Sequence, residues 1–166
     1  EGGGEGEPAG NGVGTFAEVV ERLGLGPVAE FLDSLELKGR WEELGGNYVL
    51  RPEVGVEVKA VLHFVGGAFV GAAPHVMYRY FLERLAERGF VVVATPYRIK
   101  FDYMETVDEI LSSFDKVSVG LALDYGPIPI IGVGHSAGAV LLTIAASIFP
   151  DAERAANILI SFNNKP

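Results

Sequence analysis

The sequence predicts an α/β protein, built as a three-layer α/β/α sandwich around a mostly parallel sheet. Short, almost continuously apolar runs alternate with longer amphipathic segments, as expected when strands buried on both faces are joined by covering helices. Glycine or proline separates most of these segments, which indicates turns between strand and helix. With 166 residues, of which 49% are hydrophobic, the chain can form one domain with a substantial core.

The segment before this sandwich is expected to stand apart from it. Residues 1–12 are acidic and glycine-rich, and their apolar surface is too small to offset the entropy of ordering, so we predict a flexible tail. In residues 13–40 apolar side chains recur at helical spacing, and glycines split them into two short helices. Residues 41–166 then form the sandwich, from which we expect C-terminal strands to be missing.

The first half of the sandwich begins with a strand predicted over residues 41–51, followed by a turn and an edge strand over residues 53–57. Residues 59–65 (Lys-Ala-Val-Leu-His-Phe-Val) are apolar almost throughout, which is typical of a strand covered on both faces. A glycine-rich loop follows. Pro74 then introduces an amphipathic helix, which Gly89 ends.

The second half repeats this alternation. We predict, in order, a strand over residues 90–95, a helix over 102–114, a strand over 128–133, a helix over 137–149 and a buried strand over 157–162. The first of these helices opens with Asp102-x-x-Glu105, a variant of the capping box. Parallel strands are joined by right-handed crossovers, so their carboxyl ends meet at one edge of the sheet.

The last predicted strand is apolar on both faces, yet no helix follows to cover it and no later strand pairs with its outer edge. Folded proteins cover such edges because they invite association. Two explanations stay open. Either the natural chain continues and supplies the missing strands, or a protein partner packs against the open edge between Asn157 and Phe162.

Residues 134–138 (Gly-His-Ser-Ala-Gly) lie between a buried strand and an apolar helix. Gly-x-Ser-x-Gly in this context is typical of a nucleophile elbow, a sharp turn that exposes the serine hydroxyl. The serine must adopt a strained backbone conformation, and its neighbours two residues away must be small because strand and helix nearly touch. Gly134 and Gly138 supply that room, so we predict that Ser136 is a nucleophile.

The same stretch has two other interpretations. Gly132-x-Gly134-x-x-Ala137 fits a dinucleotide-binding fingerprint, whose glycines bring a helix N-terminus against pyrophosphate. That fingerprint requires an acidic residue at the end of the next strand, whereas Asp151 precedes the next apolar run. It also normally opens the first βαβ unit. A glycine-rich turn without chemistry is the remaining interpretation, and we favour the elbow over both.

Two loops are predicted to meet beside the serine, because the carboxyl ends of parallel strands share one edge of the sheet. A serine of this kind is accompanied by two backbone N–H groups that stabilise an oxyanion. The N–H of Ala137 is one candidate donor, and the N–H of Gly67 or Ala68 is the other. The alternative is that the glycines of this second loop only permit a tight turn.

The sequence does not supply a complete catalytic triad. Elbow hydrolases take its members in the order serine, acid, histidine. The residues after Ser136 include Asp151 and Glu153 but no histidine. Without a positioned base a serine hydroxyl is a poor nucleophile at neutral pH, so we expect the acid and the histidine to come from residues outside this sequence.

The three histidines of the chain all precede Ser136 or adjoin it. We expect the His135 ring to point away from the neighbouring hydroxyl. His63 lies within a predicted buried strand and is expected to be a hydrogen-bonded core residue. His75, at the start of a helix near the carboxyl ends of the strands, is the upstream histidine best placed to face Ser136.

Polar residues after the strand over residues 90–95 also border the predicted site. Asp102 is within reach of the cleft, but helix capping explains it more simply. Tyr97, Arg98 and Lys100 are suited either to bind an anionic ligand or to solvate a loop.

Composition argues against several classes of function. The formal net charge of −9 opposes non-specific binding to nucleic acid or to an anionic membrane surface. No apolar run reaches the roughly 18 residues that a spanning helix needs. The chain has no cysteine, which excludes a disulfide framework and a thiolate metal site. We predict no cofactor, no bound metal, no nucleic-acid partner and no transmembrane segment.

Four strings of the sequence together resemble a known family. They are His63-Phe-Val-Gly-Gly-Ala-Phe-Val-Gly-Ala-Ala-Pro74, Ala94-Thr95-Pro96, Gly134-His-Ser-Ala-Gly138 and Asn157-Ile-Leu-Ile-Ser-Phe-Asn-Asn164. Over residues 41–164 the chain resembles the α/β-hydrolase-like domain-of-unknown-function family of cyanobacteria and plastids. The resemblance implies an α/β-hydrolase-like fold, minimal or truncated here. In a eukaryotic source it also implies a chloroplast location, in the stroma or at the thylakoid.

Two functions are consistent with these observations. In the first, the protein is a serine hydrolase that acts on a small acyl substrate, either an ester, a thioester or a lipid acyl group. In the second, it is a catalytically inert hydrolase-like subunit that binds a plastid, photosynthetic protein complex. The elbow favours the first function, and the open apolar edge favours the second.

Overall fold

The computed structural model describes residues 40–68, 70–149 and 154–162. The strands are β1 (Trp41–Leu44), β2 (Asn47–Leu50), β3 (Ala60–Val65), β4 (Phe90–Ala94), β5 (Ile130–His135) and β6 (Ala156–Ile160). The helices are α3 (Pro74–Met77), α4 (Arg79–Ala86), α5 (Tyr103–Tyr125) and α6 (Ala137–Ile148). The predicted tail and nearly all of the predicted N-terminal helical segment lie outside the described residues.

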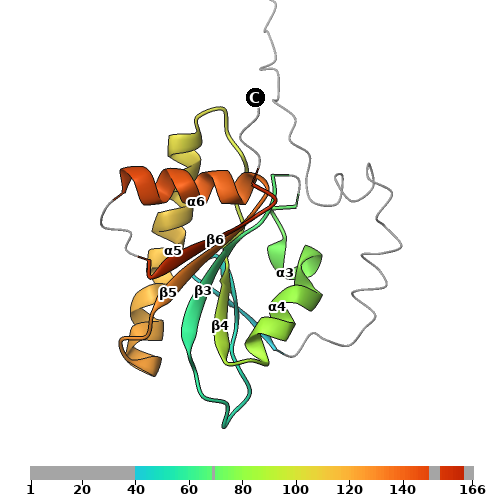
Figure 1. The fold of residues 1–166 in the computed structure, drawn as a ribbon, viewed down its shortest axis with the longest axis vertical. Helices are drawn as coiled ribbons and strands as arrows, with labels where there is room; N and C mark the ends of the chain where they lie inside the picture. Colours follow the sequence, from blue (N-terminus) through green and yellow to red (C-terminus); the bar gives the residue numbers. More distant parts are fainter. Residues whose placement is uncertain (1–39, 69, 150–153, 163–166) are drawn as a thin grey trace, which may run out of the picture.

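The strands form one sheet in the order β1-β2-β4-β3-β5-β6. Strands β4, β3, β5 and β6 are parallel, whereas the β1–β2 hairpin adds to the β4 edge in antiparallel register. Helices α3 and α4 cover one face of the sheet, and α5 and α6 cover the other (Figure 1). The structure is therefore the three-layer sandwich with a mostly parallel sheet that the sequence predicts.

The central strand β3 is buried along its whole length, because both faces of the sheet are covered. Alternate side chains of a strand point to opposite faces. Phe64 belongs to the core cluster that includes Leu82 of α4, whereas Val65 packs with Leu141 of α6. This alternation explains why residues 59–65 read as an almost unbroken apolar run.

The strand predicted over residues 41–51 is instead a two-stranded hairpin. Gly45 and Gly46 form its turn with φ of +57° and +80°. Positive φ at both central residues is what a type I′ hairpin turn requires, and glycine adopts it without a steric penalty. Residues 53–57 contain the predicted turn, but no strand forms there, so that part of the prediction was wrong.

Two helices also differ from their predicted bounds. The helix introduced by Pro74 is interrupted at Tyr78, which separates α3 from α4. Helix α5 continues past Phe114 to Tyr125, because Val117 and Leu121 extend its buried stripe along the sheet. Over the described residues, none of the helices combines the length and the hydrophobicity needed to cross a bilayer.

Strand β6 was predicted to be buried, and this was wrong. Its side chains are mostly exposed, and Ile158 and Leu159 retain 50% and 42% of their accessible surface. The cause is its position at the end of the sheet, where β5 is its only neighbouring strand among the described residues. The open apolar edge expected from the sequence is thus present in this part of the chain.

Candidate active site

Ser136 forms a one-residue turn between β5, which ends at His135, and α6, which begins at Ala137. Its φ of 54° and ψ of −118° lie in a region that non-glycine residues rarely adopt, at a cost of about 1–3 kcal/mol. The Ser136 N–H donates to the carbonyl oxygen of Ile160 in β6 (2.9 Å). The Ser136 carbonyl in turn accepts from the N–H of Ala139 (3.0 Å). Hydrogen bonds to the neighbouring strand and to the helix therefore hold the strained turn in place.

The glycines on either side of Ser136 are required by close packing. A Cβ atom on Gly134 would lie 2.7 Å from the Cα atom of Ala139 in α6. A Cβ atom on Gly138 would overlap the carbonyl oxygen of Val65 and lie 2.5 Å from that of Gly66. Strand, helix and the loop after β3 thus meet here without room for a side chain, as an elbow demands.

The alternative dinucleotide-binding interpretation fits this geometry poorly. Its first two glycines, Gly132 and Gly134, both lie inside β5 rather than in a loop beyond it. A Cβ atom on Gly132 would also lie 3.0 Å from the side chain of Arg154, so that face of the glycine is already covered. No open glycine-rich loop is available at this turn to approach a pyrophosphate.

The loop after β3 lies beside the serine. A Cβ atom on Gly67 would be 3.6 Å from the Cβ atom of Ser136. Ala137 is the first residue of α6, where backbone N–H groups lack partners within the helix. The structure therefore brings together three of the four residues proposed from the sequence. Ala68 is partly buried in the same loop, and no contact in the described part of the chain places it against the serine.

The Ser136 side chain is partly exposed, and its hydroxyl forms no hydrogen bond with any residue that the structure describes. The N–H of Gly67, by contrast, donates to the hydroxyl oxygen of Tyr78 (2.9 Å). The same hydroxyl lies 2.9 Å from Nδ1 of His135. Because it accepts from Gly67, we assign its proton to the bond with His135, whose Nδ1 is then the acceptor. The histidine next to the serine is thus engaged by Tyr78.

His63 is a fully buried core residue, as the sequence predicts. Its Nδ1 lies 2.6 Å from Nη2 of Arg154, and its Nε2 lies 3.0 Å from Oγ1 of Thr95. Its ring stacks on Phe114 of α5, with centroids 4.1 Å apart. Burial, followed by the charge of Arg154, lowers the pKa of His63 well below its usual value, so the ring is neutral at pH 7. This histidine is part of the core and does not face Ser136.

His75 does not face Ser136 either, although it was the upstream histidine best placed to do so. Its ring stacks on Tyr48 of β2 with centroids 3.4 Å apart and meets the edge of Trp41 in β1. The hairpin that the sequence did not reveal supplies both aromatic partners. Burial, with the nearby charge of Arg79, lowers the pKa of His75 to about 4. Its buried Nδ1 atom has no hydrogen-bond partner in the described structure.

The position of His75 predicts a loss of stability in mild acid. The unfolded chain takes up this proton near pH 6.5 and the folded protein only near pH 4, so the stabilisation is complete above pH 6.5 and is lost between those values. The full shift corresponds to about 3 kcal/mol, which solvent screening at a partly exposed ring reduces to about 1–2 kcal/mol. We expect His75→Phe, which keeps the stacking, to lose that much less unfolding free energy between pH 7 and pH 4.5. Urea titrations at both pH values measure this difference, and parallel pH profiles for the two proteins would contradict it.

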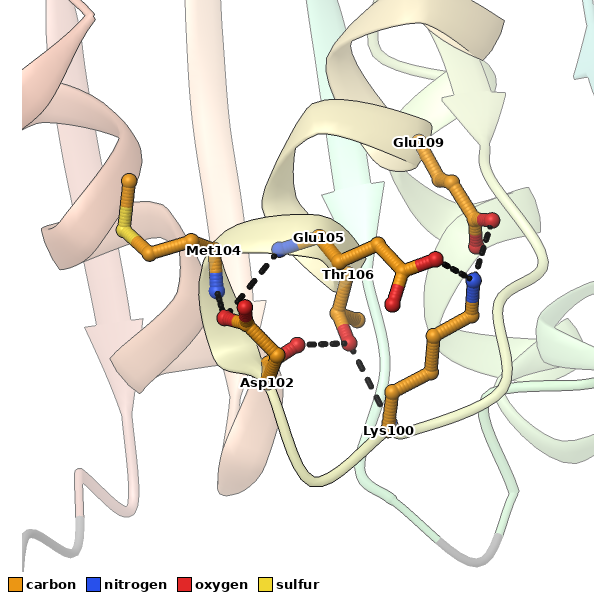
Figure 2. A network of polar contacts seen from close by, with 6 residues as sticks. All are labelled: Lys100, Asp102, Met104, Glu105, Thr106 and Glu109. Atoms are coloured by element: carbon orange, nitrogen blue, oxygen red, sulfur yellow. Dashed lines mark hydrogen bonds and ion pairs between the residues drawn. The ribbon is translucent and has the colours of Figure 1, made fainter.

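The charged loop before α5 is satisfied internally (Figure 2). The Asp102 carboxylate accepts from the N–H groups of Met104 (2.8 Å) and Glu105 (3.4 Å), which makes it the N-cap of α5. Nζ of Lys100 forms ion pairs with Glu105 and Glu109, each at 2.6 Å. Capping and surface pairing therefore account for Asp102 and Lys100 without a ligand.

Two tyrosines near the serine were not predicted correctly from the sequence: the role of Tyr97 was assigned wrongly, and Tyr78 was overlooked. Tyr97 was considered for an anionic ligand or a solvated loop, but it is 6% exposed and donates to the carbonyl oxygen of Gly66 (2.8 Å). Burial raises its pKa well above the usual value, so the hydroxyl stays protonated. Tyr78 carried no local signal, because its polar partners, Gly67 and His135, come from other elements.

No group of three or more potential metal ligands occurs among the described residues. A shallow apolar hollow of about 630 Å³ lies between the start of α5 and the end of α6, away from the elbow. Its lining includes Phe101, Met104, Ile144 and Ile148.

The mostly parallel sheet, the layers of helices and the strand-to-helix elbow together define an α/β-hydrolase-like fold, and solved structures support this assignment. An esterase of the bacterial hormone-sensitive lipase family aligns with a TM-score of 0.60 and 21% identity, over 93% of this chain and 53% of that one. A bacterial heroin esterase aligns with a TM-score of 0.57 and 20% identity, over 87% of this chain and 52% of that one. A thermophilic esterase from Thermogutta terrifontis, with butyrate bound, aligns with a TM-score of 0.53 and 25% identity, over 70% of this chain and 48% of that one.

Residues 40–166 match the family described as protein of unknown function (DUF1350), so the chain belongs to that family. No curated protein matches the sequence significantly. The chain spans 38% to 58% of the length of the first structures to which it is similar, all of which are larger than it.

Proposed function

We propose that this protein is a serine hydrolase in which Ser136 is the nucleophile and the N–H groups of Ala137 and Gly67 are the oxyanion donors. One observation carries the proposal. Ser136 is held at a strained φ of 54° between β5 and α6, with a hydroxyl that no described residue binds. Strain of this kind persists only where the surrounding structure maintains it, and it is concentrated at functional sites.

The proposed reaction is acyl transfer. Oγ of Ser136 attacks the carbonyl carbon of an ester while a base takes its proton, and the oxyanion binds at the two N–H groups. The alcohol leaves with that proton, and an acyl-serine remains. Water then attacks the acyl-serine, releases the carboxylic acid and restores the hydroxyl. Ala68 stays a candidate for the second donor in place of Gly67, since both belong to the same loop.

We propose that a residue outside this sequence supplies the base. His63 and His75 are packed in the core and against the hairpin, and Nδ1 of His135 is bound by Tyr78. A histidine contributed by residues beyond these 166 would complete the triad, with an acid from the same source. Several of the structural neighbours are esterases, which supports a carboxylic ester or a related acyl group as the substrate class.

A fluorophosphonate probe tests this proposal on the natural full-length protein. We expect labelling that disappears in Ser136→Ala, because the probe phosphonylates activated serines only. Ser147→Ala is the matched control, since Ser147 is an exposed serine on the far end of α6 and should leave labelling unchanged. A folded full-length protein that does not react, or one that reacts equally without the Ser136 hydroxyl, contradicts the hydrolase function.

A second candidate function is supported by the exposed edge of the sheet. Ile158 and Leu159 of β6, and Phe162 just after it, are each at least 42% exposed, and the outer edge of β6 is unpaired among the described residues. An inert subunit that binds a protein complex there, in a plastid as the family resemblance implies, would retain the fold without the chemistry. For this function we expect the full-length protein not to react with the probe. We also expect the protein to be found in a large complex from isolated chloroplasts.

A further inference from the structure

A single peptide group beside the serine is held at both ends by tyrosine hydroxyls. The carbonyl oxygen of Gly66 accepts from the Tyr97 hydroxyl (2.8 Å), and the N–H of Gly67 donates to the Tyr78 hydroxyl (2.9 Å). These two atoms belong to the same peptide unit. A Cβ atom on Gly67 would lie 3.6 Å from the Cβ atom of Ser136, so this peptide borders the serine.

A peptide between two glycines is the one most free to rotate, because neither flanking residue has a Cβ atom to restrict its φ or ψ. Rotation by half a turn would point the carbonyl oxygen, rather than the N–H, toward an oxyanion. An oxyanion site works only if its donors are oriented before the reaction begins. This loop therefore needs an external means of fixing the peptide.

Both tyrosines are themselves firmly placed. Tyr97 is buried, packs with Val65 and Val107, and its N–H donates to the carbonyl oxygen of Gly71 at the far end of the loop (3.0 Å). Tyr78 packs edge-on against Phe64, with ring centroids 4.7 Å apart. A Cβ atom on Gly66 would lie 2.8 Å from the Tyr78 ring, so the tyrosine also covers the peptide.

The hydrogen bonds run in one direction. The Tyr97 hydroxyl donates to the peptide, the peptide donates to the Tyr78 hydroxyl, and that hydroxyl lies 2.9 Å from Nδ1 of His135. Hydrogen bonds aligned in this way polarise one another, which strengthens the donor in the middle. We propose that Tyr97 and Tyr78 are positioning residues that clamp the Gly66–Gly67 peptide with its N–H aimed at the oxyanion site.

This inference rests on the proposed function, because it assigns the Gly67 N–H as an oxyanion donor. In the free protein the Tyr78 hydroxyl accepts that N–H, and the substrate oxygen replaces it during the reaction. The clamp is a property of the free protein as well, so it can be measured without catalysis.

Labelling kinetics with the fluorophosphonate probe test the catalytic side in the full-length protein. We expect Tyr97→Phe to lower the maximal labelling rate by about 10- to 100-fold, without changing the probe concentration for half-maximal rate, because an oxyanion donor acts in the transition state. Tyr78→Phe should also lower that rate, whereas a tyrosine that merely blocked the site would raise it on removal. Tyr125→Phe is the matched control. The Tyr125 hydroxyl accepts from Arg51 at the other end of α5 from the elbow loops, so the labelling rate of this variant should equal that of the wild type. Unchanged or faster labelling in Tyr97→Phe or Tyr78→Phe overturns the clamp.

Amide hydrogen exchange at Gly67, followed by NMR on glycine-labelled protein, tests the clamp independently of activity. We expect exchange to accelerate by about five- to tenfold in Tyr97→Phe, although Tyr97 does not touch that N–H, because the peptide is then free to rotate. Tyr78→Phe removes the acceptor of the Gly67 N–H, so its exchange rate shows the acceleration expected when that hydrogen bond is lost completely. If Tyr97→Phe does not fold, the exchange rate of Tyr78→Phe is the measurement used. Wild-type exchange at Gly67 in Tyr97→Phe overturns the clamp. A wild-type protein that does not label contradicts the hydrolase function instead, and the exchange result then still decides the clamp.

Discussion

Gly138→Ala is expected to destabilise the protein by more than about 4 kcal/mol or to prevent folding. The added methyl group would overlap the carbonyl oxygen of Val65 and lie 2.5 Å from that of Gly66. Both neighbours are backbone atoms at the end of the central strand, so no side chain can turn away to make room. Relief would require α6 to move off the sheet, which would also release the strained turn at Ser136.

Gly120→Ala is the control for this prediction. Gly120 lies within α5, and a Cβ atom there would meet no atom within 4 Å. Alanine is the better helix former, so this variant should be stabilised by about 0.5–1 kcal/mol. Urea denaturation followed by circular dichroism measures both changes. A Gly138→Ala protein whose unfolding free energy lies within about 1 kcal/mol of the wild type would show that the elbow tolerates a side chain, against the packing derived from the structure.

The parts of the fold that could be predicted are those encoded by neighbouring residues. The Gly-His-Ser-Ala-Gly stretch places two small residues two positions from a serine, and packing between strand and helix follows from that spacing alone. The apolar run over residues 59–65 likewise predicts, from its own composition, a strand that is buried on both faces. The cap at Asp102 was predictable because its partners, Met104 and Glu105, are two and three residues away.

The parts that were missed depend on residues far apart in the sequence. Tyr78 forms a hydrogen bond with His135, which is 57 residues away, and the residues around Tyr78 in the sequence do not predict that contact. His75 was considered as the upstream histidine best placed to face the serine because the hairpin that holds its ring was not recognised. Strand β6 is as apolar as a buried strand, and only its position at the end of the sheet leaves it exposed.

A buried polar network under α5 explains why a histidine lies in the central strand. The chain of hydrogen bonds runs from Arg154 through His63 and Thr95 to Asn47 and ends at the carbonyl oxygen of Ser113. With Nδ1 of His63 accepting from Arg154, its Nε2–H donates to Thr95, whose hydroxyl donates to Asn47 (2.7 Å). Asn47 in turn donates to Ser113 of α5 (2.7 Å). Every neutral member is then satisfied, which is what a polar group in a core requires.

The long side chain of Arg154 reaches this network by passing over β5 at Gly132, a position that has no side chain. Gly132 pairs with His63 in β3 on one side and with Asn157 in β6 on the other. A Cβ atom on Gly132 would lie 3.0 Å from Cδ of Arg154. The guanidinium then lies over the Phe114 ring, 5.8 Å from its centroid, and burial lowers the pKa of Arg154. His63 therefore provides an acceptor to a desolvated cation.

We expect His63→Leu to destabilise the protein by about 3 kcal/mol, because it removes an acceptor from a buried charge and a donor from Thr95. Adding Arg154→Met to this variant removes the buried charge that His63 had contacted, so the double variant should recover at least about 1 kcal/mol. Urea denaturation of the two variants and of Arg154→Met alone gives the coupling energy. If the two changes were simply additive, the arginine and the histidine would not depend on each other for stability, and the histidine in the central strand would be explained by packing against Phe114 alone.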